Sequence, residues 1–309
     1  MLDAKTLGSD SILRKIANHG ELKLYDSTDP SSAVEHIGDA KIVITNKALV
    51  DRKVMQSCPE LKLICVSATG MNNVDLEAAE ELGIAVKNAA GYGSGSVAQH
   101  TFAMILQLIH QVDYYDDYVK SGAYSENDIF THYGPSFFEL HGKSFGIIGL
   151  GNIGKAVAKI ASGFGLKVYY YSTSGANNDA EYTRLELEEL LKTCDIVSIH
   201  APLNERTDNL ISSHELSIMK PESILVNVGR GGIVNEEALA NAIDQNQIGG
   251  ACIDVYSTEP IKPDNSLLKV KYPKKLILTP HNAWTSIDSR ERLIDIVCEN
   301  IAAFQKSGN

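Results

Sequence analysis

The sequence predicts an α/β protein with two doubly wound domains, each a parallel sheet covered by helices on both faces. Three observations lead to this fold class. The chain has 309 residues, more than one hydrophobic core usually serves. Short apolar runs alternate with amphipathic segments along most of its length. One apolar run ends in a glycine-rich turn, Gly149–Gly154, immediately before an amphipathic segment.

The first third of the chain predicts one small doubly wound unit. Between its candidate strands lie segments such as Asp75–Leu82, where Leu, Val or Ala recur three and four residues apart among charged residues. That spacing is typical of a helix with one buried face. The candidate strands are Leu22–Tyr25, Ala40–Thr45, Leu61–Ser67 and Ile84–Lys87.

A long helix is predicted over residues 94–120. Its length of about 25 residues favours a crossing between domains or a subunit interface. The tract from Ser121 to Glu139 is rich in Tyr, Phe, Gly and Ser, and we expect it to be a covering loop. The helix is indicated by a single apolar stripe, which comprises Val97, Thr101, Met104, Ile105, Leu108, Val112 and Tyr115.

A second series of strands follows, and it predicts the second parallel sheet. A final helix is expected from Ile287 to Phe304. The strands of this series are Lys143–Ile148, Lys167–Tyr171, Ile196–His200, Ile224–Val228, Ala251–Val255 and Leu276–Leu278.

The balance of charge excludes two classes of partner. Lys and Arg number 28 and Asp and Glu number 39, so the formal net charge is −11. Such a charge repels nucleic acid backbones and anionic membrane surfaces at long range, so we expect neither as a partner. A small anionic substrate can still bind through local Arg side chains or helix N-termini.

The five cysteines predict reduced thiols in a protein without a metal site. None forms a CxxC pair or lies at zinc spacing with a histidine. Cys65, Cys252 and Cys298 lie within apolar runs, and we expect them to be buried. The N-terminus lacks the regions of a signal peptide, and no apolar stretch approaches the roughly 20 residues that cross a bilayer. These features favour a cytoplasmic protein.

The segment Phe145–Gly154 predicts a dinucleotide site. The apolar run Phe145–Ile148 leads directly into Gly149-Leu150-Gly151-Asn152-Ile153-Gly154 and then into an amphipathic helix. Glycines at this spacing allow a tight turn, a close approach of the backbone to a pyrophosphate, and close packing of helix on strand. The helix N-terminus then presents N–H groups and a partial positive charge to the phosphates.

The residue after the next strand leaves the choice between NAD and NADP open. An acidic side chain is expected there to bind the adenosine ribose, but Ser172 stands in its place. Serine can bind a ribose hydroxyl without repelling a 2′-phosphate. No Arg or Lys occurs from Ser172 to Tyr182 to hold that phosphate, so the pattern favours NAD modestly.

Three motifs follow later candidate strands, and together they predict the chemistry of the site. Arg230 lies among glycines in Asn227–Gly232, and its planar guanidinium suits a carboxylate. Glu259 lies in the motif Asp254-Val255-Tyr256-Ser257-Thr258-Glu259-Pro260, and His281 lies in Thr279–Trp284. Each alone is compatible with an ordinary surface or core role. A cation, a carboxylate and a histidine after successive strands of a dinucleotide fold are what carbonyl reduction requires.

The order of these motifs resembles the D-isomer-specific 2-hydroxyacid dehydrogenase family over almost the whole chain. The segments Ser67–Asp75 and Gly91–His100 look most like the glycerate dehydrogenase (hydroxypyruvate reductase) branch. The resemblance implies a flavodoxin-like substrate domain of residues 1–95 and 287–309, into which a Rossmann cofactor domain of residues 96–286 is inserted. It also implies a homodimer through the 94–120 helix and the aromatic tract. Relatives begin with a full strand, of which only Leu2 remains here.

The resemblance implies a hydride transfer between NAD(H) and C2 of a small 2-oxo or D-2-hydroxy acid, such as hydroxypyruvate or glyoxylate. His281 would give the proton, Glu259 would orient its imidazole and favour its protonated form, and Arg230 would hold the substrate carboxylate. Thr69, Gly70, Met71 and Trp284 would complete the substrate site. Asp254 would accept a hydrogen bond from the nicotinamide carboxamide, and His200 and Pro202 would line the adenine pocket. The implied cofactor contacts are Gly149, Gly151, Asn152, Ile153, Gly154, Ser172, His200, Pro202, Thr207, Val228, Gly229, Arg230, Asp254 and His281.

Two alternatives remain at this stage. A binding protein like the C-terminal-binding-protein corepressors keeps the same three catalytic residue types on the same fold. Another branch of the family, such as D-lactate dehydrogenase, differs in substrate. Formate dehydrogenase is disfavoured, because hydride transfer from formate needs no proton donor paired with Glu259.

Overall fold

The computed structural model describes residues 1–8 and 10–307, and the chain forms two compact units. The larger unit is the continuous segment Ser94–Ala283, and the smaller unit combines Met1–Gly93 with Trp284–Asn309. The chain therefore passes between the units twice, after Gly93 and after Ala283.

The larger unit is built on a parallel sheet of seven strands in the order β10-β9-β8-β7-β4-β5-β6. The strand order reverses between β4 and β7, and in open α/β sheets ligands bind beyond the carboxyl ends of the strands at such a point. The strands β7, β8 and β9 are buried throughout, as expected for a parallel sheet covered on both faces. The bounds are β4 Ser144–Ile148, β5 Lys167–Tyr171, β6 Thr183–Arg184, β7 Ile196–Ile199, β8 Ile224–Asn227, β9 Gly250–Ile253 and β10 Leu276–Leu278.

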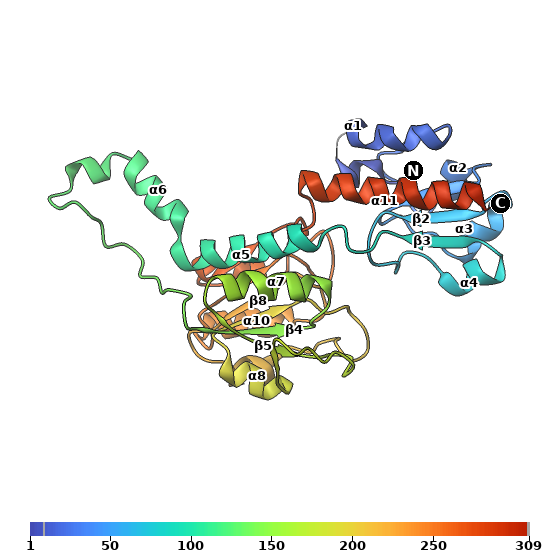
Figure 1. Ribbon diagram of the computed structural model, residues 1–309. Coiled ribbons are helices and arrows are strands. Elements are labelled where there is room, and N and C mark those ends of the chain that lie inside the picture. Colours follow the sequence, from blue (N-terminus) through green and yellow to red (C-terminus); the bar gives the residue numbers. More distant parts are fainter. Residues whose placement is uncertain (9, 308–309) are drawn as a thin grey trace. The chain divides into compact units, whose positions relative to one another are not determined.

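Helices cover both faces of this sheet (Figure 1). On one face α7 (Asn152–Gly163) packs on β4 and β5, and α5 (Ser94–His110) packs on α7. On the other face α8 (Leu187–Thr193), α9 (Ser213–Ile218) and α10 (Glu236–Asp244) enclose a large apolar cluster. The larger unit is thus doubly wound, as predicted.

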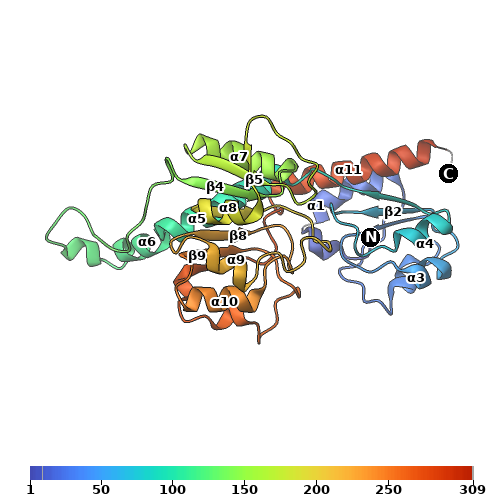
Figure 2. The same ribbon diagram turned by 90° about the horizontal axis from the view of Figure 1, so that it is seen from below.

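The predicted long helix is interrupted, and the tract after it does not cover the unit. Gln111 has a positive φ of 45° and separates α5 from α6 (Val112–Lys120). The tract then continues through a short 3₁₀ turn, Ala123–Glu126, and both views show it projecting from the body of its unit (Figures 1 and 2). Its side chains Phe130 and Tyr133 are 90% and 87% exposed, so the expectation of a covering loop was wrong. No residue of α6 is fully buried, and Val112 and Val119 are exposed.

The smaller unit has a parallel sheet in the order β1-β2-β3, which comprises Ile42–Thr45, Leu63–Val66 and Ala85–Asn88. The predicted strand Leu22–Tyr25 is irregular. Its neighbour is a short extended stretch at the N-terminus, where the Leu2 N–H donates to Ile44 O at 2.9 Å and the Tyr25 N–H donates to Met1 O at 3.0 Å. The edge of this sheet is therefore completed by isolated hydrogen bonds instead of a regular ladder.

Helices cover both faces of the smaller sheet as well. The long helix α11 (Ile287–Lys306) places Leu293 and Val297 in one cluster with Leu63 of β2. A second cluster holds residues of the helices from the other face. The remaining helices are α1 Asp10–Leu13, α2 Ala33–Ile37, α3 Arg52–Ser57 and α4 Leu76–Glu81, with 3₁₀ turns at Ala4–Leu7 and Arg14–His19.

Two further findings concern the helices and the cysteines of the described residues. No helix of the described residues is both long and apolar enough to cross a membrane. Cys65 and Cys252 are buried free thiols, as predicted, whereas Cys298 on α11 is partly exposed.

Candidate active site

The predicted site residues of the larger unit lie after the carboxyl ends of six strands of one sheet, which is the edge where parallel sheets bind ligands. Gly149, Gly151, Asn152, Ile153 and Gly154 follow β4, Ser172 follows β5, His200, Pro202 and Thr207 follow β7, Val228, Gly229 and Arg230 follow β8, Asp254 and Glu259 follow β9, and His281 follows β10.

The turn between β4 and α7 needs glycine for three different reasons. Gly149 has a φ of +94°, and a Cβ there would lie 3.0 Å from the backbone of Ala201. A Cβ on Gly154 would lie 2.3 Å from Gly149 O, so only glycine lets α7 start this close to β4. Gly151 is different, because its φ is negative and its Cβ would meet no atom of the protein within 4 Å. The fold does not require glycine there, whereas a pyrophosphate lying against the backbone does.

The N-terminus of α7 adds N–H donors to this turn. Gly151 is the N-cap and offers no side chain, and Asn152, Ile153 and Gly154 form the first turn. The first N–H groups of a helix have no partner within the helix, and its dipole favours an anion at this end. The residues after β4 therefore fit the pyrophosphate of a dinucleotide.

The end of β5 is closed by its own loop. Ser172 is only 3% exposed, and its hydroxyl accepts a hydrogen bond from the Asn177 N–H at 3.2 Å. Farther along the loop, Asp179 forms an ion pair with Lys155 of α7 at 2.9 Å. Asp179 was not singled out in the sequence, because it comes seven residues after Ser172.

His200 after β7 is a neutral group with one unused nitrogen. Burial lowers the pKa of its imidazole to about 3. Its Nε2 lies 2.8 Å from Ser198 Oγ, while its buried Nδ1 has no hydrogen-bond partner within the described part of the chain. A buried polar atom left without a partner is rare in proteins, and it fits a site that a ligand completes. Thr207 is fully buried and donates to Pro202 O at 2.6 Å, so its hydroxyl shapes the same loop.

The loop after β8 is held by Asn227, which explains the motif Asn-x-x-Arg-Gly. The Asn227 side chain donates to Arg230 O at 3.0 Å and accepts from the Gly229 N–H at 3.1 Å. Gly231 packs on the backbone of Tyr256, where an added Cβ would lie 1.8 Å from the carbonyl oxygen. The partly exposed Arg230 donates from Nη1 to Gly229 O at 2.8 Å, and its position is therefore set by the loop itself.

Glu259 and His281 are in direct contact. Glu259 Oε2 lies 2.7 Å from His281 Nδ1, and Glu259 Oε1 accepts from the Tyr256 N–H at 3.0 Å. The two side chains are 32% and 24% exposed. A carboxylate fixed by a backbone donor favours the imidazole with a proton on Nδ1, which leaves Nε2 as the nitrogen that can exchange a proton with a ligand.

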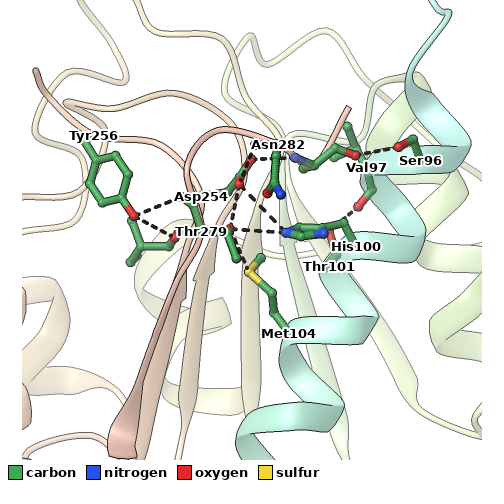
Figure 3. Close-up of polar contacts among 11 residues, drawn as sticks. Ser96, Val97, His100, Thr101, Met104, Asp254, Tyr256, Thr279 and Asn282 are labelled. Carbon is green, nitrogen blue, oxygen red and sulfur yellow. Dashed lines mark hydrogen bonds and ion pairs between the residues drawn. The ribbon is translucent and has the colours of Figure 1, made fainter. Parts of the chain in front are cut away.

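Asp254 faces inward and organises the turn after β10. It is 1% exposed, and it accepts from the Thr279 hydroxyl at 2.6 Å, the Asn282 N–H at 2.9 Å and the Ala283 N–H at 3.0 Å (Figure 3). The Tyr256 hydroxyl donates to Thr279 O at 2.9 Å, and burial raises the pKa of Tyr256 to about 12, so this donor stays protonated. Thr279 and Tyr256 lie within the predicted motifs, but neither was assigned a role, because their partners lie over 20 residues away.

The remaining predicted residues belong to the smaller unit. Thr69, Gly70 and Met71 follow β2 at the carboxyl edge of its sheet, where Asn88 Nδ2 donates to Thr69 O at 2.7 Å. Trp284 packs edge-on against Tyr92, with ring centroids 6.1 Å apart.

Comparisons with known proteins agree with this geometry. Residues 102–283 match the model of the D-isomer specific 2-hydroxyacid dehydrogenase, NAD binding domain. The chain is 38% identical over 294 residues to a hydroxypyruvate reductase of Blautia hydrogenotrophica, covering 93% of this chain and 90% of the relative. It is 34% identical over 304 residues to a glycerate dehydrogenase of Methylorubrum extorquens, covering 98% and 94%. A solved structure of Aquifex aeolicus D-lactate dehydrogenase with NAD and lactic acid superposes with a TM-score of 0.84 at 27% identity, covering 98% and 94%.

Proposed function

This chain belongs to the D-isomer-specific 2-hydroxyacid dehydrogenase family and is an NAD-dependent oxidoreductase, and we propose that it reduces hydroxypyruvate or glyoxylate at C2. The Glu259–His281 contact of 2.7 Å, at the edge of the sheet that carries the dinucleotide turn, is the observation that carries the proposal. The names of its relatives favour these two 2-oxo acids and disfavour a corepressor-like binding protein.

His281 is the proton donor in this proposal. With Nδ1 bound to Glu259, the Nε2 proton is directed to the oxygen of the carbonyl that is being reduced. Glu259 stabilises the positive charge that the ring carries before the transfer and keeps the ring in one orientation. In the direction of oxidation the same nitrogen accepts the proton of the alcohol.

Arg230 is the anion-binding group. Its guanidinium presents several N–H donors in one plane, which match the two oxygens of a carboxylate. The small residues around it, Gly229 and Gly231, let a substrate approach the backbone closely. The Thr69–Met71 loop belongs to the smaller unit, which we assign as the substrate domain.

The larger unit is assigned as the cofactor domain. Bound NAD(H) supplies or takes up the hydride. The Gly149–Gly154 turn and the N-terminus of α7 would hold its pyrophosphate, and the unpartnered Nδ1 of His200 would face its adenosine half. The preference for NAD is supported by Lys155, whose charge is already matched by Asp179 and is not free to hold a 2′-phosphate.

We propose that α6 and the tract after it bind a second copy of this chain. Val112 and Val119 are 59% and 53% exposed, and Phe130 and Tyr133 are almost fully exposed. Beside α6 lies a groove of about 650 Å³ between α5, α6 and the segment Pro273–Ile277. An exposed apolar arm next to an open groove suits a two-fold pair in which each arm enters the other groove. We also propose a cytoplasmic location, which the five free thiols support.

Light scattering after gel filtration tests the dimer. Phe130→Asp combined with Tyr133→Asp should halve the mass in solution, because two charges cannot be buried in an apolar interface. Leu82→Asp, at a residue 42% exposed on the smaller unit, is the matched control and should leave the mass unchanged. A monomeric wild-type protein would contradict the proposal.

The activity is tested by oxidation of NADH and NADPH with hydroxypyruvate, glyoxylate and pyruvate. We expect turnover with the first two and a higher kcat/KM with NADH. His281→Ala should lower kcat by at least ~100-fold while NADH affinity changes little, since the proton donor is lost and the dinucleotide turn is intact. A preference for pyruvate would move the protein to the D-lactate branch, and no turnover with any of the three would refute the proposal.

A further inference from the structure

His100 lies on α5, 179 residues before Thr279, and its ring contacts that residue's hydroxyl. The distance from His100 Nε2 to Thr279 Oγ1 is 3.2 Å, and that from Thr279 Oγ1 to Asp254 Oδ1 is 2.6 Å (Figure 3). A hydroxyl has a single proton, and the carboxylate at 2.6 Å is a closer and stronger acceptor for it than the Met104 sulfur at 3.4 Å. Thr279 Oγ1 must therefore accept from His100, so Nε2 of His100 carries a proton.

The three side chains thus form one directed chain of hydrogen bonds that ends on a buried carboxylate. His100 donates to Thr279, and Thr279 donates to Asp254. The His100 Nε2 also lies 3.8 Å from Asp254 Oδ1. Asp254 is 1% exposed, so its carboxylate oxygens depend for their hydrogen bonds on Thr279 and on the backbone N–H groups of Asn282 and Ala283.

The chain of hydrogen bonds determines the conformation of the turn that carries His281. Asp254 O accepts from the His281 N–H at 2.8 Å, and the Asp254 carboxylate accepts from the next two N–H groups, of Asn282 and Ala283. His281 has a φ of +52°, in the left-handed region that side chains other than glycine rarely adopt. Such a conformation persists only where its surroundings enforce it.

The same helix reaches this turn at a second point. The Ser96 hydroxyl donates to Ala283 O at 2.7 Å, one helical turn before His100. Two consecutive turns of α5 therefore contact the segment from Thr279 to Ala283. Ser96 binds the backbone oxygen of Ala283, and His100 binds the side chain of Thr279.

We propose that His100 is a positioning residue for the reaction: through Thr279 and Asp254 it holds His281 in its left-handed conformation and aims its Nε2. The inference rests on the proposed function of His281 as the proton donor, and it adds a residue from the helix that begins the larger unit. His100 itself exchanges no proton with the substrate.

The first test removes the donor. His100→Leu should lower kcat by about 10- to 100-fold, which is the effect of misplacing a catalytic group by about 1 Å. KM for the 2-oxo acid and for NADH should change less than about twofold, because neither ligand is bound by His100. His100→Gln places an amide N–H near the position of Nε2 and should restore kcat to within about threefold of the wild type. His110→Leu, at the other end of α5, is the matched control and should leave kcat unchanged.

The second test separates positioning from a loss of packing. Thr279→Val keeps the shape of Thr279 and removes its hydroxyl, so it should lower kcat as His100→Leu does. The double variant should be no slower than either single variant, because both changes break one chain. Additive losses would overturn the proposal, as would a wild-type kcat in His100→Leu or a His100→Gln variant no faster than His100→Leu.

A third measurement does not depend on turnover. The protein has nine histidines, so nitrogen-15 labelling of histidine gives a resolvable NMR spectrum. The backbone and ring signals of His281 should shift in His100→Leu and stay in place in His100→Gln and His110→Leu. Unchanged His281 signals in His100→Leu would overturn the inference. If the wild type reduced none of the 2-oxo acids, the proposed function would fail while this measurement still decided the positioning role.

Discussion

Acidification from pH 7 to pH 5 should destabilise the larger unit by about 2 kcal/mol through His200 alone. Burial lowers the pKa of His200 to about 3 in the folded protein, whereas a histidine of the unfolded chain titrates near 6.5. The folded-state pKa is thus the lower one. The stability that depends on the neutral ring is fully present above pH 6.5 and is lost as the pH falls from there toward 3.

The magnitude follows from proton uptake by the unfolded chain. Between pH 7 and pH 5 a group with a pKa of ~6.5 goes from about one quarter to nearly fully protonated, which lowers the free energy of the unfolded state by about 1.9 kcal/mol. The folded state gains almost nothing, because His200 stays neutral over this range. The Nδ1 of His200 is shut off from solvent, so water does not screen the effect.

The measurement is urea unfolding at pH 7 and pH 5, followed by circular dichroism. Hydrogen exchange at the β7 amides assigns the transition to the larger unit. His200→Gln keeps a polar side chain near Ser198 but does not titrate, so its loss of stability between the two pH values should be about 2 kcal/mol smaller than that of the wild type. His214→Gln, at an exposed histidine of α9, should behave as the wild type. Equal losses in the wild type and His200→Gln would refute the reasoning.

Three further predictions concern the ligand contacts. Gly151→Ala should keep the wild-type Tm but weaken NADH binding by about tenfold or more. Gly154→Ala should lower the free energy of unfolding by roughly 1–3 kcal/mol, because its Cβ overlaps a backbone carbonyl. Calorimetry measures the stability of each variant, and fluorescence titration measures its NADH binding. Arg230→Lys should raise KM for the 2-oxo acid by about tenfold with KM for NADH unchanged, and equal changes in both would contradict its role. Asp179→Asn should release Lys155 and raise kcat/KM with NADPH about fivefold relative to NADH, and an unchanged ratio would exclude Lys155 from the ribose site.

The sequence predicted most strands of the larger unit well, because most of them are apolar runs, and β7, β8 and β9 are buried throughout. The strand at β5 and the one at β10 have the predicted bounds, and β8 and β9 differ by one or two residues. The prediction of regular elements failed for two segments whose apolar side chains are not fully buried within this chain. Leu22–Tyr25 has an apolar pattern but only a short neighbour to pair with, and the stripe of the long helix continues past Gln111 onto a surface that its own chain leaves open.

The candidate site was predicted as far as its residues belong to recognisable motifs. Glu259 and His281 could be paired from their positions after neighbouring strands, and the structure has them in contact. His100 and Thr279 were not assigned the role of holding them, because these two residues lie in separate motifs and no local pattern shows that they are in contact. Asp254 was assigned to the cofactor by resemblance. Its contacts with the turn after β10 could not be predicted, because a histidine such as His281 gives no sign in the sequence that its φ is positive.

The divided smaller unit has a consequence for biosynthesis. The ribosome completes the larger unit, whose chain is continuous, before it has made the last part of the smaller unit, so the larger unit can fold while it emerges. The first 93 residues cannot complete their fold until α11 is made, because Leu293 and Val297 of α11 cover one face of β2. During translation Leu63 of β2 is therefore an exposed apolar surface that a chaperone can recognise, and nascent chains that stall before α11 should aggregate through this half-finished sheet.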